Sequence, residues 1–556
     1  MAAASRRRAN RAIAARSIAA PSGQCRPASR AHQRRAPPLP RKGRGDVRPR
    51  SWLTEPIEAK QPSSPSPDLI NEDFRPTAAS ERTFGAVDIA ALWIGLVISV
   101  PAYYLAGSLV ELGMSWFQGV ATVTVANALV LVPMVLNAHA GTKYGVPFPV
   151  LTRAAFGVKG AAIVALLRGL VACVWFGIQT WVGGSSLLTL WEALVGPAQG
   201  FAPLALIGIT APQLFFFLAF WAIQVAILVK GIESIRVVEK YSAPILIALS
   251  AALLAWAVTG ANGFGPMLST PSKFASSGDF WKVFLPSVTA NVGFWSTLSL
   301  NIPDFTRFAT SQRAQLVGQA VGLPVFMALF SFLGVAVTSA TLVIFGTAIT
   351  DPVQVVSKIG GVLPLSLSLI GLMLATISTN IAANVVAPAN ALVALAPQRI
   401  SFVKGSIITA ILGIVTQPWR LLSSTQGYIF TWLIGYSALL GPVAGILIAD
   451  YFLVRKRVMD VDALYSGSTR GAYWYSGGYN KVAFGAMALG VAPNLPGFIA
   501  TIFPTVAVPA LFTSLYSGAW FVGFLISLVA YAFIMEKAAP GIEPTTDVSE
   551  LRWVGE

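Results

Sequence analysis

The residues best suited to chemistry lie in one apolar segment, residues 374–390, which reads LATISTNIAANVVAPAN. Within it, Ala375, Ser378 and Thr379 are spaced i, i+3 and i+4, so a helix places them on one face. Two hydroxyls and a main-chain carbonyl are hard oxygen ligands, which suit a small cation, and a site without a carboxylate suits a monovalent one. The alternative is structural, because Ser and Thr hydroxyls also bond the carbonyl of the preceding helical turn.

Asparagine and tryptophan residues predict a second kind of site. Asn380 and Asn384 are four residues apart, and each amide offers one acceptor and two donors, which match the –NH–C=O edge of a lactam or nucleobase. Trp175 and Gln179 are also four apart, and Trp295 lies in another apolar segment. Two indoles and two amides predict stacking on the faces of a flat heteroaromatic ring and hydrogen bonds to its edges. Tryptophans at the membrane interface are the alternative.

Glycine and proline interrupt two of the apolar segments that must position these residues. The first segment contains Gly95 and Pro101, and the sixth contains Gly293 and Pro303. Such residues free backbone carbonyls from helical hydrogen bonds, so carbonyls near Gly95 and Ile98 could complete an oxygen shell around a cation. Interrupted helices at matching positions, five spans apart, are typical of inverted repeats that bind solutes near the membrane midplane. Ordinary proline kinks are the alternative.

The composition places these segments in a membrane. The chain has 556 residues, 55% hydrophobic and 11% charged, with a mean hydropathy of +0.67, whereas a soluble domain carries roughly 25% charged residues. Apolar runs near the ~20 residues needed to cross a bilayer recur along the chain. Lys and Arg concentrate on alternate loops, which predicts an N-terminus on the inner side. The predicted spans are residues 86–110, 116–138, 160–190, 202–229, 242–260, 281–303, 317–347, 362–392, 402–417, 427–453, 481–502 and 508–535.

The chain divides into three predicted parts. Residues 1–75 are rich in Arg, Ala, Ser and Pro, are poor in acidic residues and lack the apolar run of a secretory signal. This composition is typical of an organellar transit peptide and does not separate plastid from mitochondrion; a disordered basic tail that stays attached is the alternative. Residues 76–540 form a twelve-helix domain, and residues 541–556 form a polar C-terminal tail.

The composition also excludes several classes of function. Most of the net charge of +16 comes from the basic N-terminal segment, so the folded body offers no nucleic-acid-binding surface. The two cysteines, Cys25 and Cys173, allow no disulfide framework and no cysteine-rich metal site. The sequence contains no HExxH motif, no nucleotide-binding loop and no Ser/His/Asp grouping in a soluble domain. We therefore predict no enzyme and no resident cofactor or metal.

Four motifs carry a family resemblance, and they read VWFGIQTW, NVGFWSTLSLNIPDFTRFA, ATISTNIAANVVAPA and GPVAGILIADYFLVRKR. The chain resembles the nucleobase:cation symporter-1 family from about residue 76 to about residue 540. That family includes bacterial hydantoin, fungal cytosine, uracil and allantoin, and plant plastidic nucleobase transporters. The sixth span and the Arg-rich head look most like the plant and algal plastid branch of purine-uracil permeases.

The resemblance implies an all-α integral membrane fold of the leucine-transporter type, with about twelve transmembrane helices in a 5+5 inverted repeat and with helices 1 and 6 broken. It also implies roles for individual residues. Trp175 and Trp295 resemble the pair that sandwiches the substrate ring, and Gln179 and Asn384 resemble the amides that bind its edge. The ion ligands of sodium-coupled members resemble the carbonyl oxygens of Gly95, Ile98 and Ala375 and the hydroxyls of Ser378 and Thr379.

Two departures from the family pattern bear on the substrate. Ser99 stands where the hydantoin member has Gln, and Phe294 stands where it has Gly beside the second Trp. Ser99 removes an amide and Phe294 narrows the pocket, so uracil, adenine, guanine or allantoin should fit better than a bulky hydantoin. We therefore predict a symporter of such bases that works by alternating access. The plastid branch favours a proton over sodium as the coupling ion.

Other functions and the location complete the prediction. An amino-acid or other small-solute transporter of the same fold is the alternative function, and a membrane protein that transports nothing is a third. The expected location is the inner membrane of the chloroplast envelope, with the plasma membrane as the alternative. The expected partners are a small-molecule base, the lipid bilayer and the plastid import machinery, which would act through the N-terminal segment.

Overall fold

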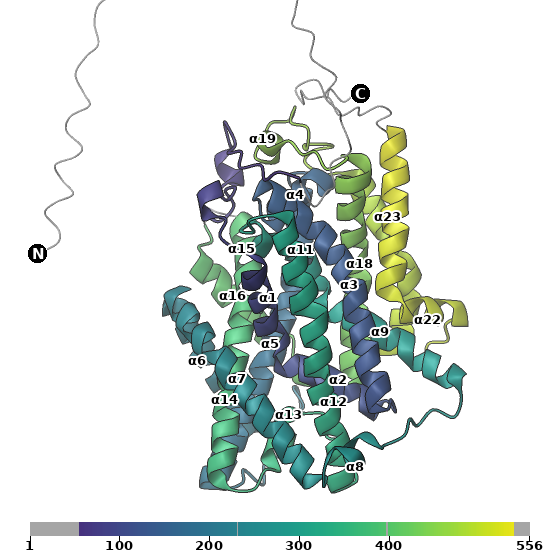
Figure 1. Cartoon of the computed structure of the whole chain (residues 1–556). Helices are drawn as coiled ribbons and strands as arrows, with labels where there is room; N and C mark the ends of the chain where they lie inside the picture. The colour runs from purple at the N-terminus through teal and green to yellow at the C-terminus, as the bar shows by residue number, and fades with distance from the viewer. Residues whose placement is uncertain (1–54, 231, 396–398, 539–556) are drawn as a thin grey trace, which may run out of the picture. The chain divides into compact units, whose positions relative to one another are not determined.

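The structure is a computed structural model that describes residues 55–230, 232–395 and 399–538 (Figure 1). These residues belong to one contact unit of the chain. Within them the regular elements are helices, with isolated bridge pairs joining Phe84 to Ala309 and Ser476 to Tyr479. The all-α prediction is therefore confirmed. Residues 1–54 and 541–556, which hold most of the predicted transit peptide and all of the predicted C-terminal tail, lie outside the described residues.

Every predicted span contains a helix. Eight helices of the described chain are long and apolar enough to cross a membrane, or up to nine if a bent pair counts as one span. The other predicted spans correspond to α7 and α16, whose apolar parts are shorter, and to α9, whose buried polar side chains lower its hydropathy. The elements are α1 (Ala86–Val97), α2 (Val100–Glu111), α3 (Trp116–Tyr144), α4 (Phe148–Phe156), α5 (Gly160–Val195), α6 (Ala211–Lys230), α7 (Ile232–Gly260), α8 (Phe264–Leu268), α9 (Ser277–Asn301), α10 (Pro303–Thr306), α11 (Gln312–Ala320), η4 (Val321–Val325), α12 (Phe326–Phe345), α13 (Pro352–Ser357), α14 (Val362–Asn384), α15 (Val386–Leu395), α16 (Phe402–Val415), α17 (Trp419–Leu422), η5 (Gln426–Leu433), α18 (Ile434–Ile448), η6 (Ala449–Val454), α19 (Val461–Leu464), α20 (Lys481–Val491), η7 (Ala492–Asn494), α21 (Leu495–Ile502), α22 (Ala510–Ser517) and α23 (Ala519–Ala538).

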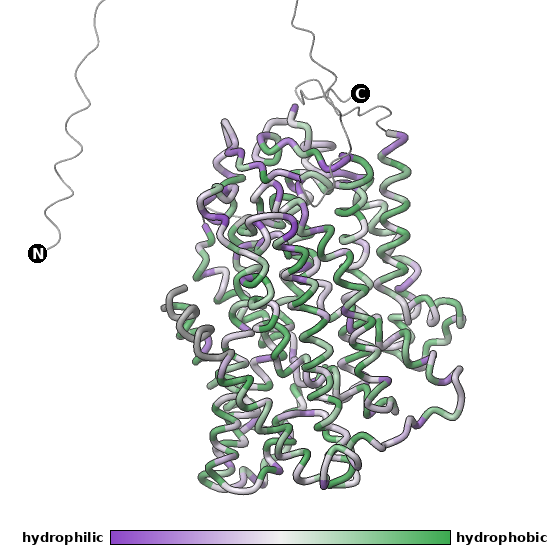
Figure 2. Tube along the Cα trace, in the orientation of Figure 1, coloured by the Kyte–Doolittle hydropathy of each residue, from purple (hydrophilic) through white to green (hydrophobic). Residues whose placement is uncertain are grey.

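The outward faces of the helices are apolar, as a bilayer requires. Exposed large side chains follow helical spacing, with Val125, Leu129 and Val132 on α3 and Val529 and Phe533 on α23. Figure 2 shows hydrophobic residues along the helices and many polar residues at the end of the bundle that carries α4 and α19. The backbone polar groups of the long helices are satisfied within each helix, so these surfaces can face lipid.

The first predicted break is present. α1 ends at Val97, α2 begins at Val100, and the two helices meet at an angle of 61°. Ile98 still donates its N–H to the Ile94 carbonyl over 3.1 Å, whereas Ser99 is extended, with φ −144° and ψ 152°. Pro101 stands in the first turn of α2, where its missing N–H costs no helical bond. The carbonyls at the end of α1 therefore lack helical partners.

The second predicted break differs from the structure. α9 is continuous from Ser277 to Asn301, and Pro303 begins the short α10 rather than interrupting α9. Gly293 lies inside α9, where an added Cβ would stand 2.6 Å from the Leu433 carbonyl oxygen. This glycine therefore allows two helices to approach closely and leaves the helix intact.

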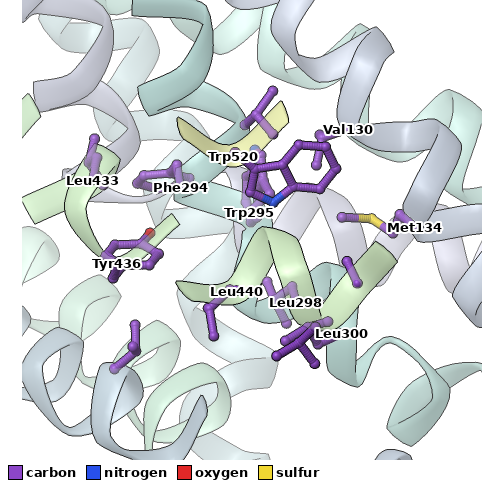
Figure 3. Packing of buried hydrophobic residues seen from close by; sticks show 14 of the residues in the cluster. Val130, Met134, Phe294, Trp295, Leu298, Leu300, Leu433, Tyr436, Leu440 and Trp520 are labelled. Carbon is purple, nitrogen blue, oxygen red and sulfur yellow. The ribbon is translucent and has the colours of Figure 1, made fainter. Parts of the chain in front are cut away.

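The main core joins the first, second, third, sixth, seventh, tenth, eleventh and twelfth predicted spans. Figure 3 shows Phe294, Trp295 and Leu298 of α9 in one cluster with Leu433 and Tyr436 of the neighbouring η5 and α18. α18 also packs along α23, where small residues let the helices approach. The core therefore holds α9 and α18 beside the break between α1 and α2.

Residues 55–75, here called the N-terminal strap, pack against the helical body. Glu58 donates its backbone N–H to the Lys143 carbonyl over 2.7 Å, and Ser66 donates to the Tyr465 carbonyl over 2.9 Å. The Glu55 carboxylate lies 3.2 Å from the Lys143 ammonium. The folded body therefore begins before the predicted boundary at residue 75.

Candidate binding site at the break between α1 and α2

A cavity of about 40 Å³ lies at the break between α1 and α2. A water needs about 10–15 Å³ on this scale, so the cavity has room for only a few waters in this conformation. All the predicted substrate-binding residues and one predicted cation ligand, Thr379, line it. The lining residues are Leu96, Ser99, Pro101, Trp175, Gln179, Phe294, Trp295, Thr297, Leu298, Thr379, Ala383 and Asn384.

The aromatic wall of the cavity is continuous. The Phe294 ring meets Trp175 edge-on at a centroid distance of 5.3 Å and Trp295 at 4.8 Å. Phe294 thus contacts both indoles of the predicted sandwich and occupies space near both. Trp93 packs edge-on against Trp295 at 5.3 Å and is fully buried, which makes it a packing residue.

Trp175 is held by further aromatic residues from the tenth predicted span. Its ring lies 6.3 Å from Tyr428, 6.0 Å from Trp432 and 6.5 Å from Tyr436, each pair edge-on. The Tyr436 hydroxyl donates to the Gly293 carbonyl over 2.7 Å and so ties this group to α9. Sequence reasoning missed these residues. Their aromatic spacing, at positions i, i+4 and i+8, was the available signal.

The polar wall comes from two amides on different helices. Gln179 of α5 is 5% exposed and Asn384 of α14 is 7% exposed, and both line the cavity. Asn384 donates one N–H to the Asn380 side-chain oxygen over 3.0 Å. Asn380 itself lies behind the wall. The two predicted amides therefore share a cavity with the predicted indoles, as edge recognition of a flat ring requires.

The α1 side of the predicted cation site consists of main-chain carbonyls. Gly95 lies in the last turn of α1, and an added Cβ there would meet no atom within 4 Å. Ile98 follows the end of the helix and lines a neighbouring, mostly apolar cavity of about 270 Å³ together with Ser99. Both carbonyls lie where helical hydrogen bonding ends, so they are available as oxygen donors.

The α14 side supplies the hydroxyls. Ala375 is 2% exposed and Thr379 is 9% exposed, while Ser378 is half-buried. α14 contacts α1, and Leu96 and Ser99 at the break line the same cavity as Thr379. Thr379 also lines the 40 Å³ cavity, so one residue borders both predicted sites. Thr376, by contrast, donates its hydroxyl back to the Leu372 carbonyl over 2.7 Å.

A second cavity, of about 240 Å³ and here called the vestibule, adjoins the first. Pro101 lines both cavities, and the Tyr428 hydroxyl donates to the Pro101 carbonyl over 3.2 Å. Glu111 and Asp351 are among the residues that line the vestibule. Burial raises the pKa of Asp351 above its usual range. The vestibule thus gives the small site a neighbour with acidic residues on the side of α13.

A buried charged network begins on α5 about two helical turns before Trp175. Arg168 of α5 is 3% exposed and donates to the Asn301 side-chain oxygen over 3.1 Å. Asn301 donates to the Asp304 carboxylate over 3.2 Å, and this carboxylate also accepts the Phe148 backbone N–H over 2.8 Å. The network ties α5, α9 and the start of α4 together. Among the described residues, no group of three or more His, Cys, Asp or Glu is placed to hold a metal ion.

The family is shown by comparison with known sequences. A family model described as permeases for cytosine and purines, uracil, thiamine and allantoin matches residues 76–523. The chain belongs to this family. The permease is therefore a membrane transport protein and not an enzyme, and the predicted membership of the nucleobase:cation symporter-1 family is confirmed.

Two named relatives cover most of the permease. It is 51% identical over 471 residues to the purine-uracil permease NCS1 of Arabidopsis thaliana, covering 85% of this chain and 78% of the relative. It is 41% identical over 489 residues to the allantoin permease of Bacillus subtilis, covering 87% of this chain and 96% of that one. The similarity therefore spans nearly the whole membrane domain.

Solved structures confirm the predicted fold class. The inward-facing form of Mhp1 matches with a TM-score of 0.70 and 25% identity, covering 84% of this chain and 94% of that one. A closed form of Mhp1 with bromovinylhydantoin bound, a nucleobase-cation-symport-1 family transporter, matches with a TM-score of 0.65 over 85% of this chain and 97% of that one. The permease shares the leucine-transporter-like arrangement of these helices.

Proposed function

We propose that this permease is a secondary active symporter of small nucleobases, namely uracil, adenine and guanine, and of allantoin, driven by a monovalent cation. Base and cation bind at the break between α1 and α2. One group of helices then moves against the rest, so that the site opens to the opposite side of the membrane. The cation gradient supplies the free energy, and no bond in the substrate is made or broken.

One observation carries the proposal. A single cavity brings together Trp175, Trp295, Gln179 and Asn384, which come from α5, α9 and α14. Indole faces suit a flat ring, and amides suit its donor and acceptor edge. Phe294 meets both indoles edge-on and takes up room beside them, which supports a small base over a bulky hydantoin.

We assign the coupling ion to the region where α1 contacts α14. A proton is the proposed ion, because the permease resembles the plastid branch of the family; Na⁺ is the alternative, because oxygen ligands of this type suit it. Neither ion needs a cofactor. The proposed ligands are the carbonyl oxygens of Gly95, Ile98 and Ala375 and the hydroxyls of Ser378 and Thr379.

The test is uptake in a yeast that lacks its own nucleobase transporters. Labelled uracil, adenine, guanine and allantoin are supplied separately, with and without a protonophore, and with Na⁺ replaced by choline. We expect uptake of at least one of these compounds, abolished by the protonophore and unchanged by choline. Loss of uptake in choline alone would assign the coupling to Na⁺. Uptake of amino acids but of no base would refute the proposed substrate class.

We also propose that the N-terminal segment directs the permease to the inner membrane of the chloroplast envelope. Since the N-terminal strap packs on the body, the targeting signal is expected within residues 1–54. A fluorescent protein fused to residues 1–54 should enter plastids of a green cell as efficiently as one fused to residues 1–75. Cytosolic fluorescence from both fusions would refute the targeting proposal, and plasma-membrane fluorescence of the full chain would place the permease there.

A further inference from the structure

A chain of hydrogen bonds leads from the cavity to a helix that does not line it. Asn384 Nδ2 donates to Asn380 Oδ1 over 3.0 Å, and Asn380 Nδ2 donates to Gln224 Oε1 over 2.8 Å. Gln224 Nε2 donates to the Thr180 hydroxyl over 3.0 Å, and this hydroxyl donates to the Phe176 carbonyl over 2.7 Å. We call Thr180, Gln224 and Asn380 the polar ladder; it joins α5, α6 and α14.

The polar ladder is unusual for its surroundings. Thr180, Gln224 and Asn380 are each 0% exposed, whereas other residues of α6, such as Phe215 and Ile223, face outward. Buried amides in an apolar interior are costly unless every group has a partner. Gln224 lines none of the cavities described above, so its amide serves the ladder itself.

The Phe176 carbonyl sets the direction of the hydrogen bonds in the polar ladder. A backbone carbonyl can only accept, and Asn380 Nδ2 lies 3.1 Å from the Phe176 carbonyl oxygen. Asn380 must therefore turn its side-chain oxygen toward Asn384, and Asn384 donates an N–H to that oxygen. A reversed Asn384 amide would place two carbonyl oxygens 3.0 Å apart. Asn384 is left with its own oxygen and its second N–H for the cavity.

We propose that the polar ladder holds the Asn384 amide in one orientation and thereby selects the edge of the base that the site accepts, with Gln224 and Asn380 as positioning residues. The inference rests on the proposed function. For a ring held in one orientation, the fixed amide accepts from a ring N–H and donates to the adjacent carbonyl, which is the lactam edge of uracil or guanine. Cytosine and adenine present the reverse, a ring nitrogen acceptor beside an amino group, so adenine ranks below uracil and guanine among the proposed substrates.

The test compares two bases of nearly equal size whose edges present donor and acceptor in opposite order. Inhibition constants for unlabelled uracil and cytosine are measured against uptake of labelled uracil by the full-length permease. The intact permease should prefer uracil by about tenfold to a hundredfold, the discrimination that one bidentate amide–base pair provides. Without the ladder, the Asn384 amide can turn over, so the preference should fall to about threefold or less.

Two substitutions at one position separate orientation from packing. Asn380→Leu keeps the volume of the side chain and removes the oxygen that accepts from Asn384, so it should lose the preference for uracil. Asn380→Asp should keep it, because a carboxyl this deeply buried stays protonated, accepts from Asn384 with one oxygen and donates with the other. Asn127→Leu is the matched control, since Asn127 is a buried amide that donates to the Val123 carbonyl of its own helix over 2.8 Å.

Each outcome bears on a different claim. An unchanged preference in Asn380→Leu, or an equal loss in Asn380→Leu and Asn380→Asp, would overturn the inference. No preference for uracil over cytosine in the intact permease would also overturn it, whereas no uptake of any base would overturn the proposed function instead. If Asn380→Leu fails to reach the membrane, Asn380→Ala supplies the test, because it removes the same hydrogen bonds and introduces no larger group.

Discussion

Substitution of Phe294 by Ala tests whether this ring sets the size of the substrate site. Phe294 is 9% exposed, lines the 40 Å³ cavity and meets Trp175 and Trp295 edge-on at 5.3 and 4.8 Å. Its removal opens space next to an existing cavity and also frees both indoles from their shared neighbour. We therefore expect weaker binding of a small base and better binding of a larger ring.

The magnitude follows from the two ring contacts. Each edge-to-face aromatic pair contributes about 0.5–1.5 kcal/mol beyond area burial, so the two together hold the indoles in place by about 1–3 kcal/mol. If all of this free energy served base binding, the inhibition constant for uracil would rise by about 5- to 150-fold. Part of it serves folding alone, so we expect a rise of about 5- to 20-fold.

The assay is competition against labelled uracil uptake by uracil and by bromovinylhydantoin, the ligand bound in the closed Mhp1 structure. Phe284→Ala is the control, because Phe284 also belongs to α9 but does not line the cavity. Its ring contacts the Phe280 ring at a centroid distance of 5.2 Å. Phe294→Ala should weaken inhibition by uracil and strengthen inhibition by bromovinylhydantoin, and the control should change neither. Unchanged values for both ligands in Phe294→Ala would refute the reasoning.

Three further changes test other parts of the structure. Trp175→Ala should weaken uracil binding by about 1–3 kcal/mol, the contribution of stacking on an aromatic ring, and an unaltered inhibition constant would reject the sandwich. Thr379→Ala should reduce the dependence of uptake on the coupling ion more than it reduces the affinity for the base. Thr376→Ala is the control and should reduce neither, because the Thr376 hydroxyl bonds a carbonyl of its own helix. Equal losses of ion dependence and of base affinity in Thr379→Ala would argue against the cation site. The Lys60 ammonium bonds the Asp462 carboxylate and lowers the pKa of that carboxyl below its ordinary value of 3.8. This contact of the N-terminal strap should therefore hold at neutral pH and be lost as the pH falls through the lowered pKa. Hydrogen exchange of residues 58–66 should accordingly be faster in Asp462→Asn than in the intact permease at pH 7 and equal below the lowered pKa, and equal rates at pH 7 would contradict this account.

Much of the fold was predictable because helical spans depend on short-range patterns. Hydrophobic runs, capping residues and the pair Ser99 and Pro101 act within a few residues, so the spans and the first break follow from local chemistry. The second break did not follow, because Gly293 has two possible roles. A glycine can interrupt a helix or admit a neighbour, and only the Leu433 carbonyl, far along the chain, decides between them.

The sequence by itself determined the residue types and the helix faces of the site. Spacing of four residues places Trp175 with Gln179 and Asn380 with Asn384, whatever surrounds them. Only the tertiary structure decided that Phe294 contacts both indoles and that Gln224, on a separate helix, completes the hydrogen bonds behind Asn384. The physical reason is range: periodicity follows from the geometry of one helix, whereas a buried amide finds its partner only when distant helices pack together.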